Sequence, residues 1–480
     1  MAFVPDHARS GLLATVLTTT LLWFGTGLHP WWPLLWLAPL PLLLLAGRAS
    51  WRTTALSSGL SWFLGGLNLW PYYHGVLEIP AGIILGMLLT PALVITGAVL
   101  LFRALLRREA PLAALLGFPA LWTSYEFLLS QVSPHGTAGN LAYTQLNCLP
   151  LLQVASLAGP WGITFLLLLF PTALAVGFQL WRTSRPRAIA LAGFGLGLIV
   201  LALGFGALRL RQRPEGRTVK VGLLACDRPG FRGVPAPGEP SARVFDAYAR
   251  EVAGLAYRGA QVIVLPEKLG VMLPPKETEL DLLYQGLADR TGATLVLGLV
   301  HATAQGRANQ ARVYAPGAPV HPYDKQHLLP GFESGYRAGA ERLVLSGHGA
   351  TMGVAICKDM DFEEPSRQYG QAGVGLMLVP GWDFGVDRWA HGHMAVMGGV
   401  ACGFSVARAA KEGYLTISDD RGRVLGEARS EAEPFATLLV EVPVAHDATP
   451  FLRWGDWFAW LSVVVLGLAL LGGSAFRWSR

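Results

Sequence analysis

The chain has few charged residues and few cysteines for its length. Charged residues make up 15% of the 480 residues, whereas 52% are hydrophobic and 16 are tryptophans. Soluble domains carry about a quarter charged residues, so this composition predicts a membrane protein with a soluble part attached. Its cysteines are too scattered for a disulfide framework, and without a CxxC pair or a Cys/His cluster no zinc site is suggested.

A strongly basic patch is also missing. The net charge is only +6, and the arginines lie mainly beside apolar segments, where they act as topology signals. This distribution argues against a nucleic-acid partner. The sequence has no internal repeats and no low-complexity tracts.

Long apolar runs occupy the first 208 residues and recur near the C-terminus. A bilayer-spanning helix needs about 20 apolar residues. On that measure we expect about eight spans, the second of which is short and contains proline. They lie near 11–28, 33–47, 55–71, 80–102, 111–130, 159–181, 188–208 and 455–475.

Charge predicts the orientation of these spans. Most arginines near the span ends fall on one side of the eight-span arrangement, and the opposite loops 29–32, 72–79 and 131–158 contain no Lys or Arg. The positive-inside rule then places both termini in the cytoplasm, and we expect the protein in a bacterial inner membrane. We expect three parts: a bundle of seven spans (1–208), a periplasmic domain (209–450) and a C-terminal transmembrane helix (451–480).

The segment 209–450 alternates apolar strand patterns with helical ones. We expect strands near 219–226, 261–265, 294–300, 311–315 and 374–379, helices near 241–259, 278–291 and 364–372, a longer helix near 388–410, and strand pairs near 413–418 and 436–442. This alternation predicts a layered α/β domain. By itself it does not separate a doubly wound sheet from a four-layer sandwich.

One stretch carries a candidate nucleophile. The apolar run Met352–Ile356 leads directly into Cys357, and charged residues follow at once. A thiol at the end of a buried strand is well placed for nucleophilic attack, although free cysteine is more often a small buried hydrophobe. Two further stretches favour the nucleophile: QVIVLPEKLG delivers Glu267 beside a strand, and HPYDKQHLLPGFE delivers Lys325.

The order Glu267, Lys325, Cys357 resembles the Glu–Lys–Cys triad of the nitrilase superfamily. The apolar segments narrow the resemblance to the apolipoprotein N-acyltransferases, and it covers nearly the whole chain. Its most specific pieces are LPE at 265–267, YDKQHLLPGFE at 323–333, AICKD at 355–359 and the stretch 141–167. The resemblance implies that the soluble domain is an α-β-β-α sandwich.

The resemblance also implies a reaction. A membrane phospholipid would donate an acyl chain to Cys357, and the α-amine of a diacylglyceryl-cysteine at a lipoprotein N-terminus would attack the thioester. Glu267 would act as general base, and Lys325 would stabilise the oxyanion and favour the thiolate. The partners are therefore a phospholipid, a lipid-modified apolipoprotein and the membrane, with no metal or organic cofactor.

Two more carboxylates are candidates for supporting roles. Glu333 follows Lys325 by eight residues, where the related enzymes keep a Glu that orients the lysine or shares proton transfer. Asp359 stands where they have a longer Glu, and we expect it to orient Lys325 or a backbone amide. Lys358 replaces an aromatic residue. Strand alternation favours an outward, solvated Lys358, since Cys357 must face the site.

The lid and the membrane side offer weaker candidates. The loop 380–394 carries Trp382 and Trp389 and suggests a mobile lid, with an ordinary connection as the equal alternative. Glu126 lies within an apolar run, which is typical of a functional or paired carboxylate or of one that reaches the interface. The broken segment 131–158 suggests a surface-lying piece that covers the entrance to the site.

The sequence departs from the family pattern in several places. Besides Lys358 and Asp359, Gln326 replaces an arginine and the lid begins Gly381-Trp382-Asp383. These changes affect substrate selectivity more than thioester chemistry. The rival interpretations are a membrane-anchored nitrilase-like amidase, an acyltransferase with a different amine acceptor, and an inactive domain that binds envelope partners.

Overall fold

The structure of the chain is a computed structural model that describes residues 6–212, 216–432 and 434–475. The chain forms two compact units. Unit 1 comprises the residues up to Val132, Gly139–Arg209 and the segment from Asp456, and unit 2 comprises Ser133–Ala138 and Leu210–Gly455. A short piece of the N-terminal half, Ser133–Ala138, therefore belongs to unit 2.

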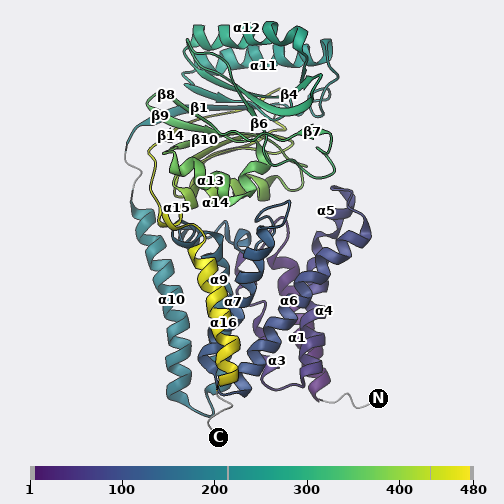
Figure 1. Cartoon of the computed structure of the whole chain (residues 1–480), viewed down its shortest axis with the longest axis vertical. Helices are drawn as coiled ribbons and strands as arrows, with labels where there is room; N and C mark the ends of the chain where they lie inside the picture. The colour runs from purple at the N-terminus through teal and green to yellow at the C-terminus, as the bar shows by residue number, and fades with distance from the viewer. Residues whose placement is uncertain (1–5, 213–215, 433, 476–480) are drawn as a thin grey trace. The chain divides into compact units, whose positions relative to one another are not determined.

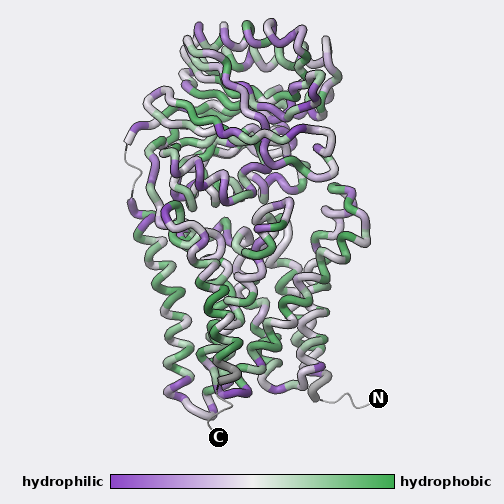
Figure 2. Tube along the Cα trace, in the orientation of Figure 1, coloured by the Kyte–Doolittle hydropathy of each residue, from purple (hydrophilic) through white to green (hydrophobic). Residues whose placement is uncertain are grey.

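Unit 1 is helical and mainly hydrophobic along its length (Figure 2). Its helices are α1 (Asp6–Gly25), α2 (Trp32–Leu35), α3 (Leu40–Ala46), α4 (Trp51–Gly66), η1 (Leu67–Leu69), α5 (Trp70–Gly75), α6 (Ala81–Arg107), α7 (Pro111–Ser130), η2 (Leu141–Gln145), α8 (Leu149–Leu152), α9 (Ala155–Leu180), α10 (Arg185–Arg211) and α16 (Trp457–Ala475).

Four described helices are long and apolar enough to cross a membrane: α6, α7, α9 and α10. The sequence predicted about eight spans, and the other four stay predictions. The second expected span is divided into the short helices α2 and α3, each with a proline in its first turn. The helix α4 is less apolar than the four long helices because it contains several serines, threonines and glycines.

Unit 2 contains two β-sheets. Sheet A has the strand order β14-β1-β2-β4-β5-β6, with β3 and β7 attached to β4 and β5, and sheet B has the order β13-β12-β11-β10-β9-β8. The strands are β1 (Thr218–Ala225), β2 (Val262–Val264), β3 (Val271–Met272), β4 (Thr294–Thr303), β5 (Gly306–Tyr314), β6 (His321–Asp324), β7 (Tyr336–Arg337), β8 (Leu343–Gly347), β9 (Ala350–Val354), β10 (Leu376–Trp382), β11 (Ser405–Lys411), β12 (Tyr414–Ser418), β13 (Val424–Arg429) and β14 (Ala436–Pro443).

Alternate residues of each strand point to opposite faces of its sheet. One face of each sheet therefore packs against the other sheet, and the opposite face packs against helices. In β1, Val219, Val221 and Leu223 join the core between the sheets, whereas Leu224 joins the core beneath the helices. The helices α11 (Glu239–Tyr257) and α12 (Pro274–Thr291) cover sheet A, and α13 (Glu363–Gln371) and α14 (Arg388–Cys402) cover the other side (Figure 1). The result is a four-layer α-β-β-α sandwich. A single turn, α15 (Pro450–Trp454), follows near the end of unit 2.

The predicted helix near 388–410 is wrong in its second half. The helix α14 ends at Cys402 because Gly403 adopts a left-handed conformation with φ of 75°. The chain then enters β11, which pairs with β10 in parallel and with β12 in antiparallel fashion. The strands β6 and β8, which lie at one edge of each sheet, were not anticipated either.

Candidate active site

Three loops at the ends of strands carry the predicted triad. Glu267 follows β2, Lys325 follows β6 directly, and Cys357 follows β9. The main chain at Glu267 passes so close to Gly298 that a larger residue would collide with it. A Cβ at Gly298 would lie 2.7 Å from the Glu267 Cα atom. Lys325 is held by its own main chain, since its N–H donates to Asn309 O at 2.8 Å and its carbonyl accepts from Gly339 N at 2.8 Å.

Glu267 and Lys325 form part of a buried network that we call the carboxylate–lysine cluster (Glu267, Lys268, Asn309, Lys325 and Glu333). Lys325 Nζ lies 3.0 Å from Glu267 Oε1 and 3.0 Å from Glu333 Oε2. Lys268 Nζ lies 2.6 Å from Glu333 Oε1. The Asn309 amide donates to Glu267 Oε1 at 2.5 Å and to Glu333 Oε1 at 2.7 Å. Two ammonium groups thus balance two carboxylates.

Burial makes these pairs electrostatically strong. Burial alone would raise the pKa of Glu333, but Lys325 and Lys268, with hydrogen bonds, outweigh it and lower that pKa to about 2. Burial alone would lower the pKa of Lys325, yet the Glu267 carboxylate, the Cys357 side chain and the Glu333 carboxylate raise it above its ordinary value. Lys325 is therefore a fixed cation, as an oxyanion stabiliser must be.

The thiol lies on a short 3-10 helix, η3 (Cys357–Asp361), which we call the thiol turn. Cys357 has a φ of 44°, which is rare for a residue with a side chain. Strained residues of this kind gather at functional sites, and Lys268 and Glu412 of the same region also have positive φ. The Cys357 thiol donates to Trp382 O at 3.7 Å, and the residue as a whole is partly exposed.

The resting environment disfavours the thiolate. Burial raises the pKa of Cys357 to about 12, and the Glu267 carboxylate adds to that rise. The cations of Arg408 and Lys325 oppose it. A proton acceptor is therefore needed for the thiol to react, and Glu267 is the carboxylate that most affects this pKa.

Asp359 connects the thiol turn to the loop that carries Lys325. One carboxylate oxygen accepts from Gln326 N at 3.1 Å and His327 N at 2.8 Å. The other accepts from Ile356 N at 3.0 Å and the Tyr323 hydroxyl at 2.8 Å. Asp359 therefore orients backbone amides on both sides of the site, which is one of the two roles expected from the sequence.

The expectation of a solvated Lys358 is wrong. Its side chain is only 5% exposed, and Nζ lies 3.1 Å from His135 Nδ1. Strand alternation does not apply here because β9 ends at Val354 and Lys358 belongs to a 3-10 helix. Burial lowers the pKa of Lys358, only partly offset by Asp361, and burial likewise lowers that of His135.

Ser133–Ala138, part of the broken segment 131–158, fastens onto the thiol turn. The Thr137 amide and hydroxyl donate to Asp361 O at 3.0 and 2.9 Å. Gly136 has a φ of 54°, and a Cβ there would lie 2.4 Å from Asp361 O. The segment is therefore fitted closely to the far end of the turn. Whether it covers an entrance stays a prediction.

The two tryptophans of the expected lid have different surroundings. Trp382 ends β10, accepts from the thiol through its carbonyl, and lies with its ring 3.8 Å from Lys411 Nζ. Trp389 lies in α14, where its ring stacks on His393 with 4.8 Å between ring centroids. The segment 380–394 is thus the end of a strand, a short turn and the start of a helix, so its prediction as one loop is wrong.

Glu126 lies within unit 1, on α7, and is buried. It accepts from Trp122 Nε1 at 3.0 Å, Leu141 N at 2.7 Å and Thr164 Oγ1 at 2.8 Å. The sequence left open a functional carboxylate, a paired one or one that reaches the interface. The three hydrogen bonds of Glu126 correspond to the paired carboxylate.

Comparison with known protein families matches both halves of the chain. Residues 18–173 match the apolipoprotein N-acyltransferase N-terminal domain, and residues 242–443 match the carbon-nitrogen hydrolase domain. The apolipoprotein N-acyltransferase of Geobacter metallireducens is 26% identical over 93% of this chain and 91% of its own. That of Gloeobacter violaceus is 24% identical over 97% and 94%. The chain belongs to the apolipoprotein N-acyltransferase family.

Among solved structures, an amidase from Nesterenkonia sp. aligns with a TM-score of 0.41 and 21% identity, covering 50% of this chain and 94% of that one. The family's carbon-nitrogen hydrolase match spans most of unit 2. This match agrees with the nitrilase superfamily resemblance of the sequence.

Three polar residues of the site in this apolipoprotein N-acyltransferase family protein were not predicted from the sequence. Lys268 directly follows Glu267, and that adjacency was the available signal for it. Asn309 comes from the middle of β5. Arg408 is 2% exposed on β11, inside the segment predicted to be helical. A charged residue flanked by alanines in an otherwise apolar stretch was the available signal for Arg408.

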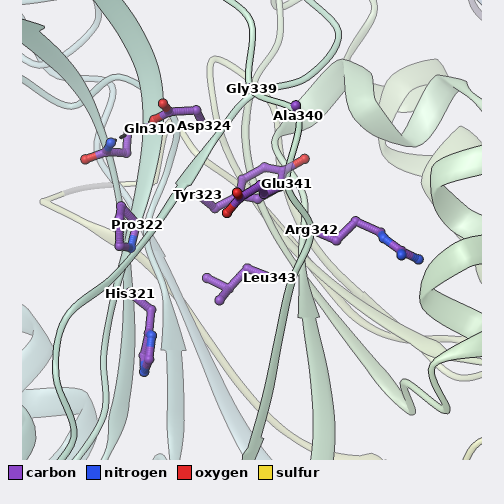
Figure 3. A pocket seen from close by; sticks show the side chains of 10 residues that line it. All are labelled: Gln310, His321, Pro322, Tyr323, Asp324, Gly339, Ala340, Glu341, Arg342 and Leu343. Atoms are coloured by element: carbon purple, nitrogen blue, oxygen red, sulfur yellow. Dashed lines mark hydrogen bonds between the residues drawn. The ribbon is translucent and has the colours of Figure 1, made fainter.

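A separate open pocket lies beside β6 and the segment 339–343, and Figure 3 shows its mixed polar and apolar lining. Its volume is about 400 Å³, and none of the predicted triad lines it. Gln310 donates to Asp324 there at 2.7 Å. A Cβ at Gly339 would lie 2.2 Å from the Asp324 carbonyl oxygen, so the pocket wall closely supports the residue before Lys325.

Proposed function

We propose that this chain transfers an acyl chain from a membrane phospholipid to the N-terminal amine of a diacylglyceryl-cysteine apolipoprotein. The observation that carries the proposal is the union of two family regions in one chain, with Glu267 and Lys325 paired in a buried cluster that interacts with Cys357. The apolar helices α6, α7, α9 and α10 suit lipid-borne substrates.

In the first half-reaction, Glu267 accepts the thiol proton and Cys357 Sγ attacks the ester carbonyl of the phospholipid. Lys325 stabilises the developing oxyanion. The carbon–oxygen ester bond breaks, and the alcohol of the lysophospholipid leaves with the proton from Glu267. The acyl group is then held on Cys357 as a thioester.

In the second half-reaction, the α-amine of the apolipoprotein attacks the thioester carbonyl and gives a proton to Glu267. The carbon–sulfur bond breaks, an amide forms, and the thiolate recovers the proton. Glu333 holds Lys325 in place, and Asp359 holds the backbone on both sides of the site. The proposal includes the membrane location and the periplasmic placement of the soluble domain.

The direct test has two parts. Incubation with phosphatidylethanolamine vesicles is expected to add an acyl group to Cys357 and to none of the other three cysteines, as located by peptide mass spectrometry. Expression in a strain depleted of its own apolipoprotein N-acyltransferase is expected to restore growth and N-acylated lipoproteins. An acyl group on Cys226 or Cys402 would refute the assignment of the nucleophile. Restored growth without N-acylation of a lipoprotein would refute the acceptor.

A further inference from the structure

Arg408 lies on β11, a central strand of sheet B, and is almost completely buried. Its neighbours Ala407 and Ala409 face the core between the two sheets, so Arg408 projects from the other face of the sheet. A Cβ at Gly381 would lie 3.0 Å from the guanidinium carbon. The glycine at 381 therefore leaves room for the guanidinium.

The guanidinium makes two kinds of contact. Nη1 and Nη2 bind the two oxygens of Asp383 at 2.9 and 2.5 Å, and Nη2 also lies 3.8 Å from Cys357 Sγ. Asp383 fixes the planar group in one orientation, as bidentate pairs do. A buried ion pair is expensive in desolvation, so its place beside the sulfur needs a reason other than stability.

The other cations of the site are already occupied. Lys325 contacts the carboxylates of both Glu267 and Glu333, and Lys268 contacts that of Glu333. Arg408 contacts one carboxylate and the sulfur. Arg408 lowers the pKa of Cys357 more strongly than Lys325 does, whereas Asp383 raises that pKa.

We propose that Arg408 is a further catalytic residue, which donates an N–H to the Cys357 thiolate, and that Asp383 is the positioning residue that aims it. The role of this contact in acyl transfer rests on the proposed function. When the thiol proton moves to Glu267, the new negative charge on sulfur is held by Arg408. When the amine displaces the thioester, the carbon–sulfur bond breaks and the departing thiolate meets the same N–H before it recovers the proton.

The pH dependence of the thiol tests this role without any lipid substrate. The charged groups that face Cys357 are Glu267 and Lys325 from sheet A and Arg408 and Asp383 from sheet B, with Lys358 next to it in the turn. The experiment measures the rate at which iodoacetamide alkylates Cys357 in the full-length protein in detergent, from pH 6 to pH 11. Peptide mass spectrometry separates Cys357 from the other cysteines.

Two variants are expected to change this rate in opposite directions. The paired variant Asp383→Asn/Arg408→Gln removes both charges, and alkylation at a fixed pH is expected to slow about tenfold, because a hydrogen bond to a charged group is lost. Asp383→Asn alone removes the negative charge that raises the pKa of Cys357, while the Asn oxygen still accepts an N–H from the guanidinium and keeps its orientation, so alkylation is expected to become faster. A merely structural pair would not produce opposite shifts.

The matched control is Asp281→Asn/Arg312→Gln, which removes another buried guanidinium and a carboxylate that pairs with it at 2.5 Å. Its alkylation profile is expected to match that of the parent. Equal profiles for all three variants, or shifts in one direction, would overturn the proposal. If the paired variant at 383 and 408 does not fold, as judged by thermal unfolding, Asp383→Asn decides alone: unchanged or slower alkylation would overturn the role.

The outcome is independent of the acyl donor. A parent protein that takes no acyl group from phosphatidylethanolamine vesicles would count against the proposed function, while the alkylation shifts would still decide the role of Arg408. A normal acyl transfer with no alkylation shift would retain the function and refute the inference.

Discussion

The carboxylate–lysine cluster and the thiol turn are held in place by different means. The cluster belongs to the sheet A side, and the side chains of Glu267, Lys325 and Glu333 are almost completely buried and bind one another. The thiol turn follows sheet B strand β9 and is held through its backbone, by Asp359 and by the segment 133–138. Cys357, the proposed nucleophile, is partly exposed as a residue.

This difference separates two requirements of covalent catalysis. Charges that stabilise a transition state must be fixed in advance, which buried and mutually paired side chains achieve. A nucleophile must be reachable, which suits the role proposed for Cys357 on a strained turn whose main chain, not its side chain, is anchored. The cluster is therefore expected to respond most to loss of charge, and the turn to loss of backbone support.

Removal of the central cation is expected to have the largest effect. Lys325→Ala leaves the carboxylates of Glu267 and Glu333 facing each other without their shared ammonium. Single-turnover thioester formation on Cys357 is expected to fall about a hundred- to a thousandfold, and stability to fall by about 3–5 kcal/mol. Lys276→Ala, which removes only an exposed pair with Glu279, is the control and is expected to change neither by much. Near-parental thioester formation in Lys325→Ala would contradict the expectation that the cluster responds most to loss of charge.

Acid is expected to weaken the cluster through Glu333. Its pKa of about 2 lies below the ordinary value of 4.5, so the ionised form stabilises the fold above pH 4.5 and that contribution is lost as pH falls toward 2. The size is about 3 kcal/mol for a shift of this extent. Thermal unfolding at several pH values is expected to show a steeper acid loss for the parent than for Glu333→Gln. Glu279→Gln is the exposed control, and an identical slope in all three proteins would contradict the prediction.

Loss of the carboxylate that supports the turn is expected to slow the reaction less. Asp359→Ala leaves backbone amides of Ile356, Gln326 and His327 without their acceptor, at about 1–3 kcal/mol for each buried donor. Thioester formation is expected to slow about ten- to a hundredfold, because both Cys357 and Lys325 lose their alignment. Asp289→Ala, which removes an exposed acceptor for Gly317 N, is expected to react at the parental rate. A normal rate in Asp359→Ala would mean that the strained turn keeps its conformation without the hydrogen bonds of Asp359.

The smallest effect is expected where the segment 133–138 meets the turn. Gly136→Ala would bring a Cβ within 2.4 Å of Asp361 O, whereas Gly139→Ala has a similarly positive φ of 92° and nothing within 4 Å. Both changes strain the backbone, but only the first displaces the segment from the turn. Thioester formation is expected to slow about two- to tenfold in Gly136→Ala relative to Gly139→Ala, since a misplacement of about 1 Å lowers rates. Equal rates would show that the turn does not need this support.

Part of this site follows from local patterns. The buried strands end before Glu267, Lys325 and Cys357, and hydrophobic runs with charged ends are visible without a structure. The pattern of strands and helices likewise predicts a layered domain. The sequence did not reveal that residues 405–411 form a strand, because their alanines suit a helix equally well and only pairing with β10 and β12 decides between the two.

The chain by itself determined the order of its chemical groups, the apolar segments and the places where strands end, since these depend on local composition and on the period of side chains. Only the tertiary structure decided which charges pair, that Lys358 turns inward to His135, and that Arg408 reaches Cys357 from a strand 51 residues away in the sequence. Pairing across two packed sheets depends on register and on the room left by Gly381 and Gly298. Neither quantity is a property of a single segment.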